Sequence, residues 1–114
     1  MFRFILATGL IVFTGLLPAS PPVPAGSEAI RLDDPAVIQR GEKQFARTCA
    51  VCHGHAGSGG RGKPLADRNL DEKRIFNTIT NGLRRGASFM PAFEKTLTPA
   101  QRRELIAYIL TLGK

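Results

Sequence analysis

Apolar residues recur at helical spacing in three segments of the chain. In the first segment, four residues on one stripe of a helix follow at intervals of four, namely Val37, Gly41, Phe45 and Cys49. Asp34-Pro35 precedes this stripe and supplies an N-cap followed by a proline at the first helical position, where a missing N–H costs nothing. The pattern predicts a helix that begins at Pro35 and leads directly into Cys49.

The second helical segment follows Asn69-Leu70-Asp71-Glu72. Asn69 is the expected N-cap, with a glutamate three residues later and acidic side chains in the first turn, where they complement the helix dipole. Asn81-Gly82 is expected to end this helix, and 84–88 to form a short basic loop after it. The apolar face of the segment comprises Leu70, Ile75, Phe76, Ile79 and Leu83.

The third segment begins at Thr98-Pro99-Ala100-Gln101, a capping box with proline at the first helical position. We expect the helix to end near Gly113. Its buried side is expected to comprise Leu105, Ile106, Ile109, Leu110 and Leu112. No segment alternates between apolar and polar residues for long enough to predict a strand. The sequence therefore predicts an all-α fold, a compact bundle of about three to four short helices.

The N-terminal residues have the order of a secretory signal peptide. Arg3 precedes a short apolar run, 4–17, and small residues then offer a cleavage site after Ala25. The alternative is an uncleaved membrane anchor, although the run of 14 residues is shorter than the roughly 20 that a spanning helix needs. We therefore divide the chain into a signal peptide, a flexible lead-in and one folded domain, at 1–25, 26–33 and 34–114.

Charge becomes informative once the signal peptide is set aside. Residues 26–114 carry 15 basic and 9 acidic side chains, a net charge of +6. This excess predicts acidic partners or an anionic surface. It does not indicate nucleic acid, because an exported chain is removed from the genome and no helix-turn-helix or basic-heptad pattern is present.

Cys49-Ala50-Val51-Cys52-His53 is a C-x-x-C-H run, the attachment signature of a c-type haem. Two thiols three residues apart on a turning backbone can each add to a vinyl group of the same porphyrin, which gives two thioether links. His53 follows at once and can reach the iron as the proximal ligand. The sequence therefore predicts one covalently bound haem c per chain, with the helices wrapped around it.

A C-x-x-C pair also occurs in redox-active disulfides and in zinc sites. A thioredoxin-like pair requires a preceding strand, whereas the segment before Cys49 has a helical pattern. A structural zinc site requires four ligands, usually from separated pairs. The two cysteines and two histidines of this chain all lie within 49–55. A zinc ion bound there would therefore not connect distant parts of the chain.

The segment 54–65 contains five glycines in twelve residues and is expected to be a loop. Pro64 near its end can present a carbonyl that accepts the second ring proton of His53 and so fixes its tautomer. A plain turn proline is the alternative. His55 is expected to face solvent, because a residue two positions beyond His53 cannot reach the opposite face of a haem.

Met90 is the only methionine besides Met1, and Pro91 follows it. It lies between two predicted helices rather than on an apolar helical stripe. A thioether presented by such a loop can coordinate the iron from the face opposite His53. Ordinary core packing is the alternative, since methionine suits it well.

With these residues in place, the segment from about Asp34 to Gly113 resembles the class I c-type cytochromes, and its short glycine-rich loop is most like the small bacterial monohaem members. The combination of C-x-x-C-H with a downstream Met-Pro is specific. The resemblance implies thioethers from both cysteines, His53 as the proximal and Met90 as the distal ligand of the iron. It also implies a pocket that includes Pro64 and Leu65.

The resemblance further implies that Gly41 and Phe45 contact a C-terminal helix that carries Tyr108. From the residues alone, Gly41 is either a tolerated helical glycine or a point where another backbone comes close.

The resemblance implies an electron-transfer protein and not an enzyme. The function expected is a periplasmic single-electron carrier whose donor and acceptor are redox proteins with acidic docking surfaces. The alternative is a dedicated cytochrome c subunit of a periplasmic dehydrogenase or another oxidoreductase complex. A third hypothesis is a haem sensor or enzyme with an open sixth position. No stable membrane span is expected after cleavage of the signal, whereas an uncleaved signal would leave the domain anchored to the membrane.

Overall fold

The computed structural model describes residues 15, 16 and 30–114. The predicted signal peptide, its cleavage site and most of the lead-in lie outside the described residues. The element order is α1 (Pro35–Thr48), α2 (Ala50–His53), a 3-10 turn (His55–Gly57), α3 (Glu72–Asn81), β1 (Leu83–Arg85), β2 (Ser88–Met90) and α4 (Pro99–Leu112). Within the described part of the chain, none of the helices is both long and apolar enough to cross a membrane.

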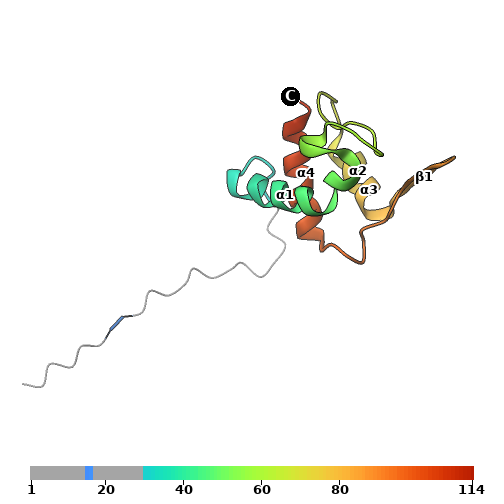
Figure 1. Cartoon of the computed structure of the whole chain (residues 1–114). Helices are drawn as coiled ribbons and strands as arrows, with labels where there is room; N and C mark the ends of the chain where they lie inside the picture. Colours follow the sequence, from blue (N-terminus) through green and yellow to red (C-terminus); the bar gives the residue numbers. More distant parts are fainter. Residues whose placement is uncertain (1–14, 17–29) are drawn as a thin grey trace, which may run out of the picture.

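Helices α1 and α4 cross each other (Figure 1). Gly41 of α1 lies against Glu104 and Tyr108 of α4. A Cβ atom at Gly41 would collide with the carbonyl oxygen of Glu104 and would lie 3.0 Å from Cβ of Tyr108. One turn further along α1, the rings of Phe45 and Tyr108 lie 5.2 Å apart between centroids, at an interplanar angle of 59°. The close approach of another backbone, one of the two explanations for Gly41, is therefore confirmed.

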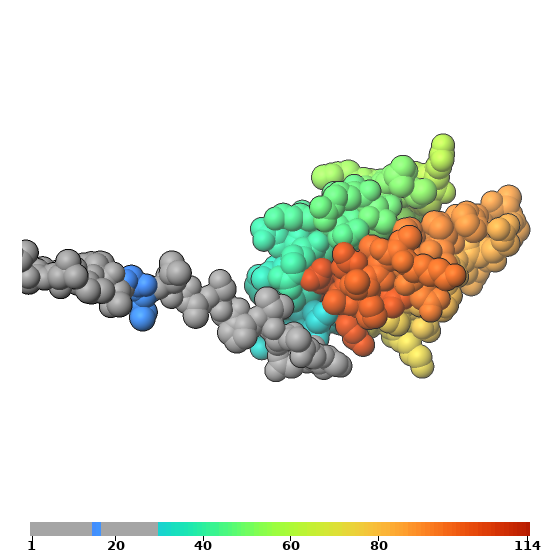
Figure 2. All heavy atoms as spheres, turned by 90° about the horizontal axis from the view of Figure 1, so that it is seen from below, coloured from blue at the N-terminus to red at the C-terminus, as the bar shows by residue number. Residues whose placement is uncertain are grey.

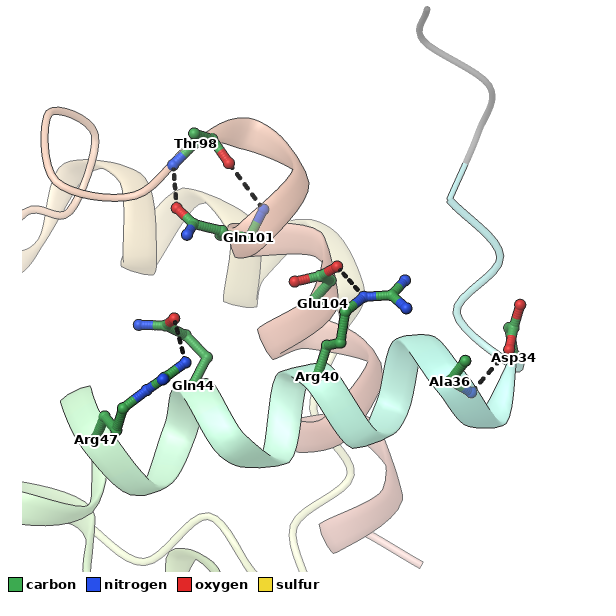
Figure 3. Close-up of polar contacts among 8 residues, drawn as sticks. All are labelled: Asp34, Ala36, Arg40, Gln44, Arg47, Thr98, Gln101 and Glu104. Carbon is green, nitrogen blue, oxygen red and sulfur yellow. Dashed lines mark hydrogen bonds and ion pairs between the residues drawn. The ribbon is translucent and has the colours of Figure 1, made fainter. Parts of the chain in front are cut away.

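Polar contacts fix the ends of α1 and α4 and join the two helices (Figure 3). The Asp34 carboxylate accepts a hydrogen bond from the Ala36 amide at 2.8 Å, as predicted for the N-cap of α1. The capping box of Thr98 and Gln101 at α4 is also confirmed. Arg40 Nε and a carboxylate oxygen of Glu104 form an ion pair at 2.6 Å, next to the crossing at Gly41.

Helix α3 begins two residues later than the predicted cap implies. Its N-cap is Asp71, which accepts a hydrogen bond from the Arg74 amide at 2.9 Å, and not Asn69. Its end at Gly82 agrees with the prediction. Leu83 was predicted on the apolar face of this helix, but it lies in β1 and is 43% exposed.

The core lies where α1, α3 and α4 meet. Phe45, Leu105 and Ile106 are almost fully buried in it. Arg102 is buried as well, because its guanidinium stacks over the ring of Phe76 at 5.2 Å and donates a hydrogen bond to Thr80 Oγ1 at 3.2 Å. These contacts tie α4 to α3. The remaining members of the core cluster are Ile75, Ile79, Leu97, Tyr108 and Ile109.

The predicted basic loop after α3 is a short antiparallel hairpin that projects from the body of the domain (Figure 1). Leu83 pairs with Met90, Arg84 with Phe89 and Arg85 with Ser88. Gly86, at φ 58°, occupies the first position of the two-residue turn, where hairpin turns favour glycine. Strands of three residues are too short to show alternation, and the domain is helical apart from them.

Candidate haem site

The C-x-x-C-H motif lies at the point where α1 passes into α2. Cys49 follows the last residue of α1, and α2 ends on His53. Both cysteines are half-buried, and neither forms a disulfide. Burial, and secondarily the neighbouring Cys52, raises the pKa of the Cys49 thiol to about 11. Redox-active C-x-x-C pairs depend on a lowered thiol pKa, so this environment does not favour that alternative.

A backbone carbonyl fixes the orientation of the His53 ring. His53 Nδ1 lies 2.8 Å from the carbonyl oxygen of Lys63. A carbonyl only accepts hydrogen bonds, so Nδ1 carries a proton, and in the neutral ring Nε2 is then the unprotonated nitrogen. This is the tautomer that a metal-binding histidine requires.

The carbonyl that fulfils this role comes from the residue before the predicted one. We predicted the carbonyl of Pro64, but that oxygen accepts a long hydrogen bond from Arg68 Nη1 at 3.5 Å. The proline acts indirectly, because the residue before a proline is restricted to extended backbone and Lys63 is that residue. The prediction that the carbonyl of Pro64 is the acceptor was therefore wrong by one position.

The glycine-rich loop folds back against the motif. The Gly62 amide donates to the Cys52 carbonyl at 2.8 Å, and the Gly59 amide donates to the His53 carbonyl at 2.6 Å. A Cβ atom at Gly62 would lie 2.9 Å from His53 Nδ1, which is too close for a side chain. The loop thus satisfies the carbonyls at the end of α2 and cradles one edge of the ring. The sequence predicted a loop but not these contacts.

Met90 is the last residue of β2 and lies at the base of the hairpin, half-buried against the core. The backbone of Gly82 presses on it from the end of α3: a Cβ atom at Gly82 would lie 2.6 Å from the Met90 carbonyl oxygen and 2.8 Å from the Ala92 nitrogen. Three residues after Met90, the Phe93 amide donates to the Ile79 carbonyl at 2.9 Å. Met90 therefore has a fixed place against the end of α3.

Several of the predicted site residues meet at the same core. Cys49, Leu65 and Met90 are each partly buried against one apolar cluster. Pro64 is exposed beside Lys63, and His55 is exposed in the 3-10 turn, as predicted. Within 30–114, no three side chains of the types His, Cys, Asp and Glu gather as a metal site would require.

This donor set fits a haem c. It offers two thiols at the attachment spacing, one imidazole in the metal-binding tautomer, and one thioether beside a buried apolar cluster. The imidazole has room in its observed orientation because residue 62 is a glycine; a Cβ atom there would obstruct the ring.

Comparison with known families agrees with this geometry. Residues 36–109 match the family described as cytochrome c oxidase, cbb3-type, subunit III. The chain belongs to this family of c-type cytochrome domains. Its members carry covalently bound haem c, and the homologues are electron-transfer cytochromes. The resemblance to class I c-type cytochromes is thereby confirmed.

Named relatives include oxidase subunits and a separate cytochrome. The domain is 39% identical over 90 residues to the cbb3-type cytochrome c oxidase subunit FixP of Azorhizobium caulinodans, covering 71% of this chain and 29% of that protein. It is 32% identical over 88 residues to cytochrome c-L of Methylorubrum extorquens, covering 72% of this chain and 43% of that protein. The chain thus spans less than half the length of either relative.

The fold is also that of a solved cytochrome. Cytochrome cL from Methylophaga aminisulfidivorans superposes with a TM-score of 0.60 at 27% identity, over 72% of this chain and 59% of that one. The predicted fold class, a helical bundle of the cytochrome c type, is therefore confirmed, and the hairpin is a minor addition to it.

Proposed function

We propose that the protein is a periplasmic single-electron carrier that uses one haem c with His53 and Met90 as axial ligands. The observation that carries this proposal is a pair of backbone arrangements, one that orients the His53 ring and one that fixes the backbone of Met90. The Lys63 carbonyl orients the His53 ring, and the backbone of Gly82 presses against Met90. Ligands held on both faces leave no open position for a substrate, which favours a carrier over a haem enzyme or sensor.

Each remaining site residue has a role in this proposal. Cys49 and Cys52 supply the two thioether links. Leu65, half-buried against the core, lines the pocket. Pro64 lies beside the acceptor carbonyl and restricts the backbone of Lys63, so it positions His53 through that residue.

When bound, the haem iron supplies a one-electron couple between its ferrous and ferric forms. The chain tunes that couple from both sides. The hydrogen bond from His53 Nδ1 to the Lys63 carbonyl makes the imidazole a more basic ligand. Met90, in place of a second histidine, raises the reduction potential. The carrier is therefore expected to be relatively oxidising.

Gly82→Ala is expected to weaken or abolish ligation by Met90 while the domain stays folded. The new Cβ atom would meet the backbone of Met90, Pro91 and Ala92. Gly82 also has φ 72° and ψ −176°, a region that is essentially restricted to glycine and costs another residue about 1 to 3 kcal/mol. The segment that carries Met90 would have to move. The absorption spectrum of the oxidised protein measures this, because thioether ligation gives a weak band at the red end.

Gly86→Ala is the matched control for this prediction. Gly86 lies in the turn of the hairpin that follows Gly82 and also has a positive φ, 58°, but a Cβ atom there meets nothing within 4 Å. This variant should be strained by its positive φ but should keep the thioether band. If Gly82→Ala and Gly86→Ala gave the same spectrum, Gly82 would have no part in placing the ligand.

Electron exchange with an acidic redox protein is expected to slow as salt rises. The domain and its lead-in carry a net charge of +6, and the screening length falls from about 30 Å at 0.01 M to about 3 Å at 1 M ionic strength. Stopped-flow oxidation of the reduced protein by a plant plastocyanin, an acidic blue-copper protein, should slow about tenfold or more over this range. Oxidation by a neutral quinone should not. A plastocyanin rate that is independent of salt would oppose acidic partners.

The second candidate function is that of a dedicated cytochrome subunit in a larger oxidoreductase complex. Two observations favour it. Named relatives such as FixP are oxidase subunits, and the domain exposes Leu83 and Phe89 to 43% and 64%. Purification of the exported protein as a monomer, without a co-purifying enzyme, would count against this candidate.

The location in the periplasm depends on the N-terminal segment. The proposal assigns 1–25 to a signal peptide removed on export, 26–33 to a lead-in, and 34–114 to the cytochrome domain. If the signal were retained, the same domain would be anchored to the membrane and would act there.

A further inference from the structure

The large apolar side chains that the domain exposes are not scattered over its surface. Within 30–114 they are Val51, Leu83 and Phe89. Val51 lies between the two cysteines of the attachment motif. Leu83 pairs with Met90 across the hairpin, and Phe89 directly precedes Met90. Single exposed apolar residues need no explanation, but here all three belong to the segments that carry the haem-binding residues.

The hairpin carries unpaired positive charge beside the exposed ring of Phe89. The guanidinium of Arg84 lies 5.0 Å from the centroid of the Phe89 ring, its partner across the strands. Arg85 follows at the turn. None of the ion pairs found within the described residues involves either arginine, and the sequence has no acidic residue from Leu83 to Phe93.

The base of the hairpin is anchored although its tip projects. Gly82 contacts the backbone of Met90 to Ala92, and the returning chain donates backbone hydrogen bonds from Phe93 to Ile79 and from Glu94 to Thr80, at 2.9 and 3.2 Å. In Figure 2 the hairpin forms an extension of the domain surface. A partner seated on it therefore meets a preorganised surface, which reduces the entropy cost of binding.

We propose that the hairpin 83–90 is the docking element for a redox protein whose contact face has an apolar centre rimmed by carboxylates. This inference rests on the proposed electron-carrier function. Phe89 supplies the apolar contact, and Arg84, its cross-strand partner on the same face of the hairpin, pairs with the carboxylates of the partner. Arg85 adds positive charge beside the turn. Docking there would bring the partner within one residue of Met90. One electron then leaves the reduced domain and reduces the metal centre of the partner.

The test compares charge removal on the hairpin with equal charge removal elsewhere. The variants are Arg84→Gln/Arg85→Gln and, as the matched control, Lys73→Gln/Arg74→Gln, which removes two exposed positive charges from the start of α3. The full haem-loaded protein is reduced and mixed with plastocyanin at low salt. We expect the hairpin variant to lose about tenfold in second-order rate constant and the control about twofold. Equal losses in both would overturn the proposal, because only net charge would then matter.

The apolar contact is tested by Phe89→Ser at high salt, where steering is screened. A loss of about threefold or more in the rate with plastocyanin is expected, with the thioether band and the potential unchanged. An unchanged rate would remove the apolar part of the proposal. Should Phe89→Ser alter the band, Phe89→Ala replaces it in this test. The carrier function and the docking surface are tested separately. A wild type that no one-electron oxidant of higher potential can oxidise contradicts the carrier function. Normal oxidation of the wild type, with hairpin variants that react as fast as it does, contradicts only the docking surface.

Discussion

Replacing Met90 by alanine should lower the reduction potential of the domain by a few tenths of a volt, out of the roughly 0.8 V range that axial ligands control. A thioether favours the ferrous form, and alanine offers no ligand at all. The measurement is a spectroelectrochemical titration of wild type and variant. Leu110→Ala is a suitable control, because Leu110 is also partly buried against the core but is far from the hairpin in sequence. This control should keep the potential close to that of wild type.

The same variant tests whether the sixth position is closed in the wild type. Reduced Met90→Ala should bind carbon monoxide quickly, whereas the reduced wild type should bind it slowly or not at all. If both proteins bound it equally fast and had the same potential, Met90 would be only a core residue. The haem sensor or enzyme hypothesis would then replace the carrier.

Gly41→Ala should destabilise the domain by about 3 kcal/mol or more, which corresponds to a drop in Tm of at least about 12 °C. Helix propensity alone predicts the opposite, since alanine is favoured over glycine by about 1 kcal/mol inside a helix. The sign of the effect therefore shows which factor dominates. The structure places the Glu104 carbonyl where the new methyl group would go, so α1 and α4 would have to separate. Thermal or denaturant unfolding followed by circular dichroism measures the change.

Two controls make the Gly41 result specific. Ala46→Gly, at an exposed position of the same helix, calibrates propensity and should cost about 1 kcal/mol. Tyr108→Ala combined with Gly41→Ala should not restore stability, because the obstructing atoms belong to the backbone of Glu104 rather than to the Tyr108 side chain. Stability that rose in Gly41→Ala, or returned in the double variant, would contradict the backbone contact.

The features predicted correctly from the sequence are those with a local cause. Asp34 and Thr98 cap their helices through contacts with residues two and three positions away, so a short motif contains the whole interaction. The stripe through Gly41 and Phe45 identified the buried face of α1 because helical periodicity determines it. The C-x-x-C-H motif is local in the same sense.

The predictions that were wrong concern choices that tertiary structure makes. Asn69 and Asp71 are both good caps, and the helix begins at the second, with Leu70 packed against the core just before it. The acceptor for His53 is the backbone of Lys63, and any residue there would supply a carbonyl, so no side chain reveals it. The hairpin had one sequence signal, glycine followed by one residue between two short segments, but its strands are too short to alternate visibly.

The absorption spectrum of the purified wild-type protein, oxidised and reduced, tests the central claim most directly. The account predicts a low-spin, six-coordinate haem c in both states, with the weak thioether band at the red end of the oxidised spectrum. Together these features would establish that His53 and Met90 both bind the iron. A high-spin, five-coordinate spectrum without that band would contradict the account and leave Met90 as a packing residue.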